Sequence, residues 1–417
     1  MQNITITGIQ TKDARFPLED GAGSDAVHSG AEYAFAVTQL QTDKGIQGTG
    51  ICLTLGTGNQ LVCEAIEYLS AHLRDLDIEE LMSNFGVVSR SMADEPGMRW
   101  LGPHKGVVHL ALASIVNACF DLWAKARQVP LWRLLLDLTP EQLVDLLDFH
   151  YLEDHLTREE ALAIFRDHLA TRARREGVLR TGYPGYDTSV GWFQYEDERI
   201  RENAKKALDS GFQAIKLKVG SKDGERDVRR ANLLREIVGS QGTIMLDANQ
   251  QWTLAEARKM CAALAPMNPY WVEEPTHPDD IQAHRELARE IVPMRIALGE
   301  HVPNLVLFKN FIEAKAVHFM QPDCTRLAGV SEFITASLLA RKYGLPVVPH
   351  VGDMGQIHQH LVLFNHIAMG HEALFLEHIP HLRKHFCHPA TVSNGVYQTP
   401  QEPGLSSDLR EATAGGR

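Results

Sequence analysis

Seven ionisable residues recur at nearly even spacing through the second half of the chain. Each follows a short apolar run, and consecutive members lie 23 to 29 residues apart. One strand, one helix and their turns take about this length, so each residue would close the carboxyl end of a strand in a repeated βα unit. In a closed (β/α)₈ barrel these ends converge on one mouth, where catalysis takes place. The seven are Lys218, Asp247, Glu273, Glu300, Asp323, His350 and Glu377.

Three consecutive members of this series are carboxylates, Asp247, Glu273 and Glu300. Hard oxygen ligands of this kind suit Mg²⁺, which takes a few carboxylates together with water and substrate oxygens. Neither cysteine nor histidine stands among them, so zinc is less favoured. Because side chains alternate along a strand, only one of Glu273 and Glu274 can face the mouth. We assign Glu273 as the ligand, and Glu274 to a supporting role or a helix N-terminal charge.

The two lysines of Lys216-Leu-Lys218 would lie on the same face of one strand. Each ammonium group disfavours protonation of the other, and a nearby cation adds to this, so we expect a lowered lysine pKa and a usable base. Such a base could remove the α-proton of a carboxylate substrate whose enolate is stabilised by Mg²⁺. His350 could then protonate a leaving group, while Asp323 holds the imidazole tautomer and raises its pKa.

The other histidines carry weaker signals. His301 follows Glu300 and should point the opposite way, and we weigh a substrate contact and a structural role for it equally. His358 and His360 are two residues apart and would not share a helix face, so we expect both to be structural. A further group has helix-compatible spacing but lacks an acidic pattern that would indicate a metal site: His378, His381 and His385.

The elements that must position these residues change type near residue 183. Before it, strand-like alternation at 4–8 and 34–42 precedes helical stretches from about 61 to 126, and 141–175 is charged and helical, which is an α+β order. After it, apolar runs alternate with amphipathic helices at 197–210, 253–264 and 331–343. Such alternation predicts a parallel sheet, and eight units close a barrel. The apolar runs are 214–219, 244–246, 270–272, 295–298, 316–320, 345–348 and 373–376.

The composition limits the partners. Among 417 residues, 41 Lys and Arg stand against 53 Asp and Glu, a net charge of −12. This argues against nucleic acid or an anionic membrane as a partner, since phosphate binding needs a basic face, whereas a metal ion can still attract an anionic small molecule. Six scattered cysteines favour a reducing, cytoplasmic environment over a disulfide framework. The apolar stretch 107–123 is too short and polar to span a bilayer, and we expect a buried helix.

An ordered set of motifs runs along nearly the whole chain. It comprises Asp13-Ala-Arg-Phe-Pro17, Gly23-Ser-Asp-Ala26, Arg99-Trp-Leu-Gly-Pro103, Leu138-Thr-Pro-Glu-Gln-Leu-Val-Asp145, Lys216-Leu-Lys-Val-Gly220, Asp247-Ala-Asn-Gln250, Glu273-Glu-Pro-Thr276, Pro278-Asp-Asp280, Gly299-Glu-His301 and Pro349-His350. The set resembles the enolase superfamily, in its mandelate-racemase-like branch, and within that branch the L-fuconate dehydratases. The resemblance implies an α/β fold with an α+β capping domain over 1–180, including a subgroup insert at about 141–180, and a modified TIM barrel over 181–380. A C-terminal segment, 381–417, would return to the capping domain and end in a disordered tail.

The resemblance also implies roles for individual residues. Asp247, Glu273 and Glu300 would bind Mg²⁺, and Glu377 would hydrogen-bond the substrate carboxylate or enolate oxygen. Lys218 would abstract the α-proton, tuned by Lys216, and His350 would act as general acid, paired with Asp323. Residues expected to contact the substrate are Ser24, Asp25, Trp100, Asn249 and His301.

The activity implied is Mg²⁺-dependent dehydration of a mono-acid sugar, with L-fuconate, giving 2-keto-3-deoxy-L-fuconate, as the first expectation. L-Galactonate and D-arabinonate are alternative substrates, an acid-sugar racemase or epimerase with Lys218 and His350 as two bases is a rival, and a catalytically silent paralogue is a third possibility. The family resemblance also implies a homo-oligomer. The run Val351-Gly-Asp-Met-Gly-Gln-Ile-His358 is about two residues shorter than the Gly-Gly-rich run of the family, which bears on substrate identity more than on reaction class.

Overall fold

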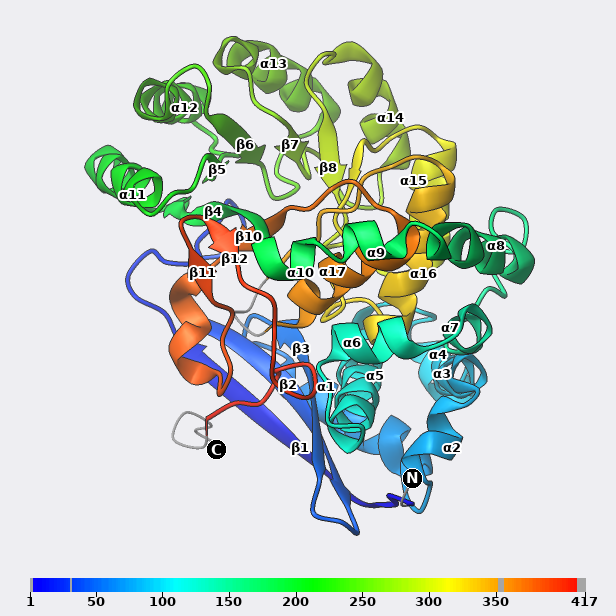
Figure 1. The fold of residues 1–417 in the computed structure, drawn as a ribbon. Helices are drawn as coiled ribbons and strands as arrows, with labels where there is room; N and C mark the ends of the chain where they lie inside the picture. The colour runs from blue at the N-terminus through cyan, green and yellow to red at the C-terminus, as the bar shows by residue number, and fades with distance from the viewer. Residues whose placement is uncertain (1–2, 31, 352–355, 411–417) are drawn as a thin grey trace.

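The chain folds into an N-terminal α+β part and a barrel, joined by a C-terminal segment that contacts both (Figure 1). The structure is a computed structural model that describes residues 3–30, 32–351 and 356–410. The α/β class predicted from the sequence, with a capping domain and a TIM-type barrel, is confirmed.

The N-terminal part is an antiparallel sheet backed by helices. Its strands β1 (Ile6–Pro17), β2 (Glu32–Thr42) and β3 (Gln47–Thr54) pair in chain order. The long helix α5 (Gly106–Ala126) packs on this sheet, and Gly50 permits the close approach, because a Cβ there would collide with the Ser114 carbonyl. The helices around it are α1 (Asn59–Ser70), η1 (Ala71–Leu73), α2 (Ile78–Met82), α3 (Phe85–Ala93), α4 (Pro96–Leu101), α6 (Leu131–Asp137) and α7 (Pro140–Asp145).

Helix α5 matches the buried helix predicted for 107–123. By length and apolar composition it could cross a membrane, but 89% of its most apolar window is buried inside the protein. Its buried Asn117 is paired inside the protein, since Asn117 Nδ2 donates to the carbonyls of Ile51 and Cys324. This pattern is that of a core helix in a packed domain.

The barrel is a parallel ring of short strands. In space, β10 (Leu376–His378) pairs with β4 (Tyr183–Gly191), and the order continues β5 (Ala214–Lys218), β6 (Thr243–Asp247), β7 (Val272–Glu273), β8 (Ile296–Leu298) and β9 (Phe319–Met320). Residues 345–348, predicted to be a strand, instead form one isolated bridge, Met320 to Val347. Pro346 and Pro349 lack the N–H groups that a longer ladder needs.

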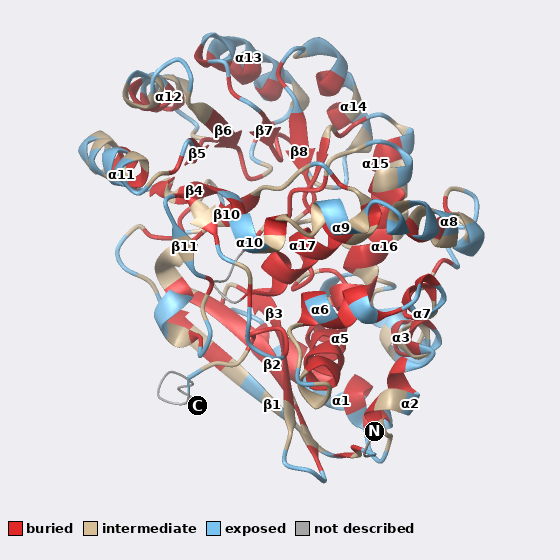
Figure 2. Ribbon diagram, viewed as in Figure 1, coloured by how far each residue is buried: buried red, intermediate tan, exposed pale blue. Residues whose placement is uncertain are grey.

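Helices surround this ring with their apolar sides inward (Figure 2). Figure 2 shows exposed residues on the outer faces of α11 to α14 and buried ones toward the strands, whereas α16 and α17 are buried along most of their length. The helices are α11 (Asp197–Asp209), α12 (Gly224–Val238), α13 (Leu254–Leu264), η2 (Ala265–Met267), α14 (Ile281–Glu290), α15 (Leu305–Glu313), α16 (Gly329–Lys342) and α17 (Ile357–Met369).

The segment predicted as helical over 141–175 is broken. After α7 the chain leaves helical geometry until α8 (Arg158–Leu169), followed by α9 (Arg172–Arg175) and α10 (Val178–Thr181). A capping box explains the restart, because Thr157 Oγ1 accepts from Glu160 N while the Glu160 carboxylate accepts from Thr157 N. Phe165 of α8 packs against Phe364 of α17, so this insert covers helices of the barrel.

The C-terminal segment runs from the barrel back to the N-terminal sheet. It contains η3 (Pro380–His385), β11 (Val392–Ser393) and β12 (Val396–Tyr397), and β12 pairs antiparallel with β4. Farther on, the Asp408 carboxylate accepts from Thr49 Oγ1 at 2.6 Å and from Lys125 Nζ at 2.7 Å. The predicted disordered tail, residues 411–417, lies outside the described residues.

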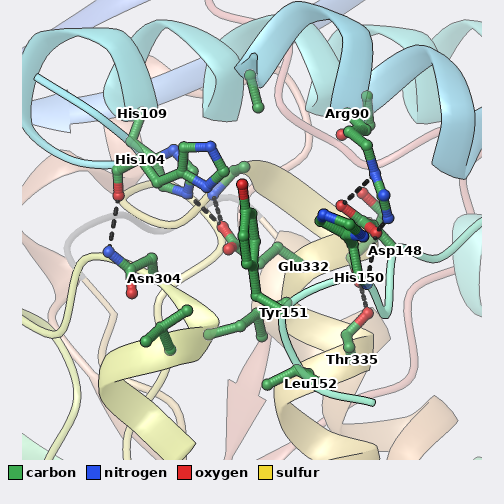
Figure 3. A pocket seen from close by; sticks show the side chains of 16 residues that line it. Arg90, His104, His109, Asp148, His150, Tyr151, Leu152, Asn304, Glu332 and Thr335 are labelled. Atoms are coloured by element: carbon green, nitrogen blue, oxygen red, sulfur yellow. Dashed lines mark hydrogen bonds and ion pairs between the residues drawn. The ribbon is translucent and has the colours of Figure 1, made fainter. Parts of the chain in front are cut away.

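A small cavity of about 50 Å³ marks the seam between the two parts (Figure 3). Across it, His109 Nε2 of α5 lies 2.7 Å from Glu332 Oε2 of α16, and Asn304 Nδ2 donates to the His104 carbonyl at 2.9 Å. These links tie the capping helices to the barrel and so hold the mouth of the barrel against the N-terminal part.

Candidate active site

The spaced ionisable residues gather at one end of the barrel. Strand register places Lys218 beside Asp247 and Asp247 beside Glu273, at the carboxyl ends of β5, β6 and β7. Glu300 follows β8 after one residue, and Glu377 lies in β10. The convergence predicted from their spacing is therefore present in the structure.

Asp247, Glu273 and Glu300 form one cluster, with one carboxylate oxygen from each lying within 4.8 Å of the others. Glu300 Oε2 is buried, with the imidazole of His350 beside it at 3.1 Å. Burial, opposed by the neighbouring Lys216 ammonium, raises the pKa of Glu273 to about 8. Packed carboxylates of this kind need a cation, and the all-oxygen donor set fits Mg²⁺.

The two lysines lie on one strand face, as predicted, and each pairs with carboxylates of the cluster. Lys216 Nζ is 2.7 Å from both Glu273 Oε1 and Glu377 Oε1, and Lys218 Nζ is 2.5 Å from Asp247 Oδ2. Burial disfavours both ammonium groups, yet the adjacent carboxylates outweigh it and raise the pKa of each lysine. Without a cation these carboxylates outweigh the repulsion between the two lysines, and the lowering predicted for a lysine beside Mg²⁺ stays a prediction.

His350 and Asp323 form the predicted pair. His350 Nδ1 lies 2.7 Å from Asp323 Oδ2, and its Nε2 lies 3.1 Å from Glu300 Oε2. Burial lowers the pKa of His350, but Glu300 and Asp323 overcome it and raise that pKa to about 9. Asp323 Oδ1 accepts from Thr325 N and Oγ1, which anchors the carboxylate. His358, expected to be merely structural, lies 3.0 Å from the same oxygen.

Glu377 is fixed from three sides. Its Oε1 accepts from Lys216 Nζ at 2.7 Å and from Thr188 Oγ1 at 2.5 Å, and its Oε2 accepts from Val351 N at 3.1 Å. Burial would raise the pKa of Glu377, but Lys216 and His350 outweigh it and lower that pKa. The carboxylate therefore stays ionised beside the lysines.

A cavity of about 330 Å³ lies between this cluster and the capping domain. The barrel side is polar, and the capping side is mostly apolar. Barrel residues that line it are Lys218, Asn249, Glu300, His301, Arg326, His350 and Glu377, and apolar capping residues are Leu53, Leu55, Leu61, Val62, Val107 and Leu110. Such a mixed cavity suits a small ligand with one charged end.

Three of the five predicted substrate contacts line this cavity. Asp25 reaches it from the capping domain, paired with His28 Nδ1 at 2.9 Å. Asn249 follows β6, and its buried Oδ1 has no hydrogen-bond partner among the described residues. His301 Nδ1 lies 3.0 Å from Glu274 Oε1, so Glu274 supports His301.

The other two predicted contacts, Ser24 and Trp100, do not line this cavity. Ser24 is fully buried, and its hydroxyl donates to the Gly21 carbonyl at 2.6 Å and accepts from Gln194 N at 3.0 Å, so it braces a loop. Trp100 is 91% exposed and does not line the cavity. Glu95 caps the short helix α4 through Met98 N, and this orientation turns Trp100 to solvent.

Sequence reasoning missed five polar residues that line the cavity, namely His28, Tyr33, Thr54, Thr57 and Arg326. His28 pairs with Asp25 three residues earlier, and that spacing is the one signal that could have indicated it. Arg326 Nε donates to the Glu300 carbonyl at 2.7 Å, a contact that only the fold creates. Residues 352–355, the core of the altered loop after His350, lie outside the described residues.

Comparisons with known proteins agree with this geometry. The family described as enolase C-terminal domain-like matches residues 199–413, and the mandelate racemase / muconate lactonizing enzyme N-terminal domain matches 15–135. L-galactonate dehydratase from Hypocrea jecorina is 38% identical over 98% of this chain and 93% of its own length. The crystal structure of human mitochondrial enolase superfamily member 1 superimposes with a TM-score of 0.96 at 38% identity, covering 99% of this chain and 96% of that one.

A third relative bears on the metal. L-talarate/galactarate dehydratase from Salmonella typhimurium LT2, liganded with Mg and L-lyxarohydroxamate, has a TM-score of 0.77 at 25% identity and covers 99% of this chain and 92% of that one. Mg²⁺, the cofactor predicted from the carboxylate series, is thus bound in a solved protein of the same fold. The two matched domains, the relatives and the carboxylates at the barrel mouth lead to one conclusion. The chain belongs to the enolase superfamily, in the mandelate racemase and muconate lactonizing enzyme branch.

Proposed function

We propose that the protein is a hydro-lyase that removes water from a mono-acid sugar. The observation that carries the proposal is the placement of Lys218 and His350 on one cavity beside the three clustered carboxylates, with Asp323 held against His350 Nδ1. A base and an acid that act on neighbouring carbons of one substrate are what β-elimination needs.

The residues divide the work as follows. Asp247, Glu273 and Glu300 would hold Mg²⁺, which supplies Lewis-acid stabilisation of negative charge on the substrate and offsets the carboxylate field around the lysines. Lys218 Nζ accepts the proton from C2, and the electron pair moves into the C1–C2 bond. Lys216, held by Glu273 and Glu377, stabilises the charge at the substrate carboxylate.

Elimination completes the reaction. His350 donates a proton to the C3 hydroxyl as the C3–O bond breaks, so that one water leaves. The resulting enol becomes the 2-keto-3-deoxy acid. Asp323 accepts from His350 Nδ1 and so stabilises the protonated ring. The other nitrogen, Nε2, lies on the side of Glu300 and is the one that would donate the proton.

For the substrate we propose L-fuconate, which is L-galactonate without the C6 hydroxyl. The apolar capping wall supports it, because residues such as Leu53, Leu55 and Leu61 fit a methyl end better than a hydroxymethyl end. L-Galactonate is the alternative, and the 38% identical L-galactonate dehydratase supports it. A homo-oligomer and a cytoplasmic location also belong to this proposal, the first from the family resemblance and the second from the scattered cysteines.

A substrate panel tests the proposal. Purified protein with Mg²⁺ is given L-fuconate, L-galactonate and D-arabinonate, and formation of the 2-keto group is followed by absorbance and mass. A loss of 18 Da that needs both Mg²⁺ and Lys218, judged against Lys218→Ala, would support dehydration. An unchanged mass with inversion at C2 would favour the epimerase, and neither reaction nor α-proton exchange in D₂O on any of these acids would refute the proposal.

A further inference from the structure

The indole of Trp192 forms one wall of the cavity beside Lys218. Trp192 directly follows β4, its side chain is buried, and it lines the cavity. Lys218 Nζ lies 5.6 Å from the centre of its ring, a distance at which an ammonium is attracted to an indole face. The ring therefore limits where the lysine head group can go.

The backbone on both sides of this contact is held by one buried arginine. Arg230 Nη1 donates to the Lys218 carbonyl at 2.8 Å, and its Nη2 donates to the Trp192 carbonyl at 2.7 Å. Gly191, just before the tryptophan, brings β4 close to β5, since a Cβ there would meet Leu217. These contacts hold the two backbones, and the indole itself makes a separate polar contact.

That contact is with His381 of the C-terminal segment. Trp192 Nε1 donates to His381 Nε2 at 2.6 Å, and the two rings lie 5.5 Å apart at an angle of 40°. Because Nε2 accepts, the imidazole proton sits on Nδ1 in the neutral ring. Burial lowers the pKa of His381, which is consistent with a neutral acceptor. The same segment also reaches the site at Tyr397, whose hydroxyl donates to the Glu377 carbonyl at 2.5 Å.

We propose that His381 is a positioning residue: its hydrogen bond to Trp192 Nε1 holds the indole against Lys218 and so aims the base at the α-carbon. The inference rests on the proposed function for the role of Lys218, but the hydrogen bond itself can be tested separately. Sequence spacing left His378, His381 and His385 without a role, and the proposal assigns one to His381. It also makes the C-terminal segment part of the active site.

A matched pair of variants tests the positioning role in the full-length protein. His381→Leu removes the acceptor, whereas His381→Gln offers a side-chain carbonyl in its place. We expect His381→Leu to lower kcat by about tenfold to a hundredfold, the range expected for a misplaced catalytic group, with KM changed little. The deuterium isotope effect on kcat with C2-deuterated substrate should rise, because proton abstraction becomes slower, and His381→Gln should restore most of the rate.

A double-mutant cycle shows whether the effect passes through the indole. If it does, His381→Leu costs little further rate in a Trp192→Phe background. Additive losses, equal losses in His381→Leu and His381→Gln, or full activity of His381→Leu would each overturn the proposal.

A readout that needs no substrate separates this inference from the proposed function. In ¹⁵N-tryptophan-labelled protein, the indole N–H resonance of Trp192, identified by its absence in Trp192→Phe, should move upfield and exchange faster with water in His381→Leu. An unchanged resonance would overturn the hydrogen bond and with it the proposal. If the unmodified protein turned over no acid sugar while this resonance moved as expected, the proposed function would fail and the positioning of Trp192 would stand.

Discussion

Replacing Asp323 by Asn should separate the two proton transfers of the proposed reaction. The carboxylate is fully buried, with Oδ2 at 2.7 Å from His350 Nδ1 and Oδ1 bonded to Thr325 N and Oγ1. An Asn of equal size keeps its carbonyl on Thr325, which turns its NH₂ group toward His350 Nδ1. The imidazole then loses a charge-assisted hydrogen bond worth about 1.5–3 kcal/mol. Since about 1.4 kcal/mol is a factor of ten in rate, dehydration should slow by roughly 10- to 150-fold.

The assay measures both half-reactions on the same enzyme. Dehydration is followed by keto-acid formation, and C2 proton abstraction by loss of the C2 proton signal in D₂O. Exchange should fall by less than about threefold, because Lys218 is bonded to Asp247 rather than to Asp323. Thr325→Val is the matched control, since it removes one hydrogen bond from Asp323 but keeps the charge. Parallel losses of exchange and dehydration in Asp323→Asn, or an equally large loss in Thr325→Val, would refute the reasoning.

Three further outcomes are expected. Mg²⁺ at 100 times its dissociation constant should add about 2.7 kcal/mol to the unfolding free energy in urea, an effect that EDTA reverses and that a metal-free fold would not show. Lys216→Met should cost about 3–5 kcal/mol, because it leaves Glu273 and Glu377 buried without their cation, and part of the loss should return with Mg²⁺; equal urea midpoints would contradict this. Burial lowers the pKa of His371 to about 4, so its unfolded form alone gains a proton as pH falls from about 6.5 to 4 and stability declines across that window. His371→Gln, which can still donate to the Ser337 carbonyl, should flatten that decline in urea unfolding at several pH values, and an unchanged slope would contradict the assignment.

The sequence by itself determined the barrel and the chemistry at its mouth. Strand and helix periods fix the length of a βα unit, so residues placed one unit apart, such as Asp247, Glu273 and Glu300, must meet at one end of a parallel ring. The identity of their side chains already selects an oxygen-loving cation. This is why the metal cluster and the His350–Asp323 pair could be located without coordinates.

The electrostatics of the lysines depended on the tertiary structure. Asp247 from the neighbouring strand lies 2.5 Å from Lys218 Nζ and raises the pKa of Lys218, an effect that the sequence reasoning did not include. Distance enters Coulomb energy directly, and strand register alone does not give the distance between side-chain ends. Hence the sign of the shift could not be derived from the spacing of the two lysines.

The walls of the cavity also depended on the tertiary structure. Trp100 and Ser24 sit in motifs that favour a substrate contact, yet a capped helix turns the first to solvent and a loop uses the hydroxyl of the second. Conversely, Arg326 and the Trp192–His381 pair reach the site through contacts between segments far apart in the chain. Periodicity determines which element a residue belongs to, but only the packing of one element on another decides which side chains face the same space.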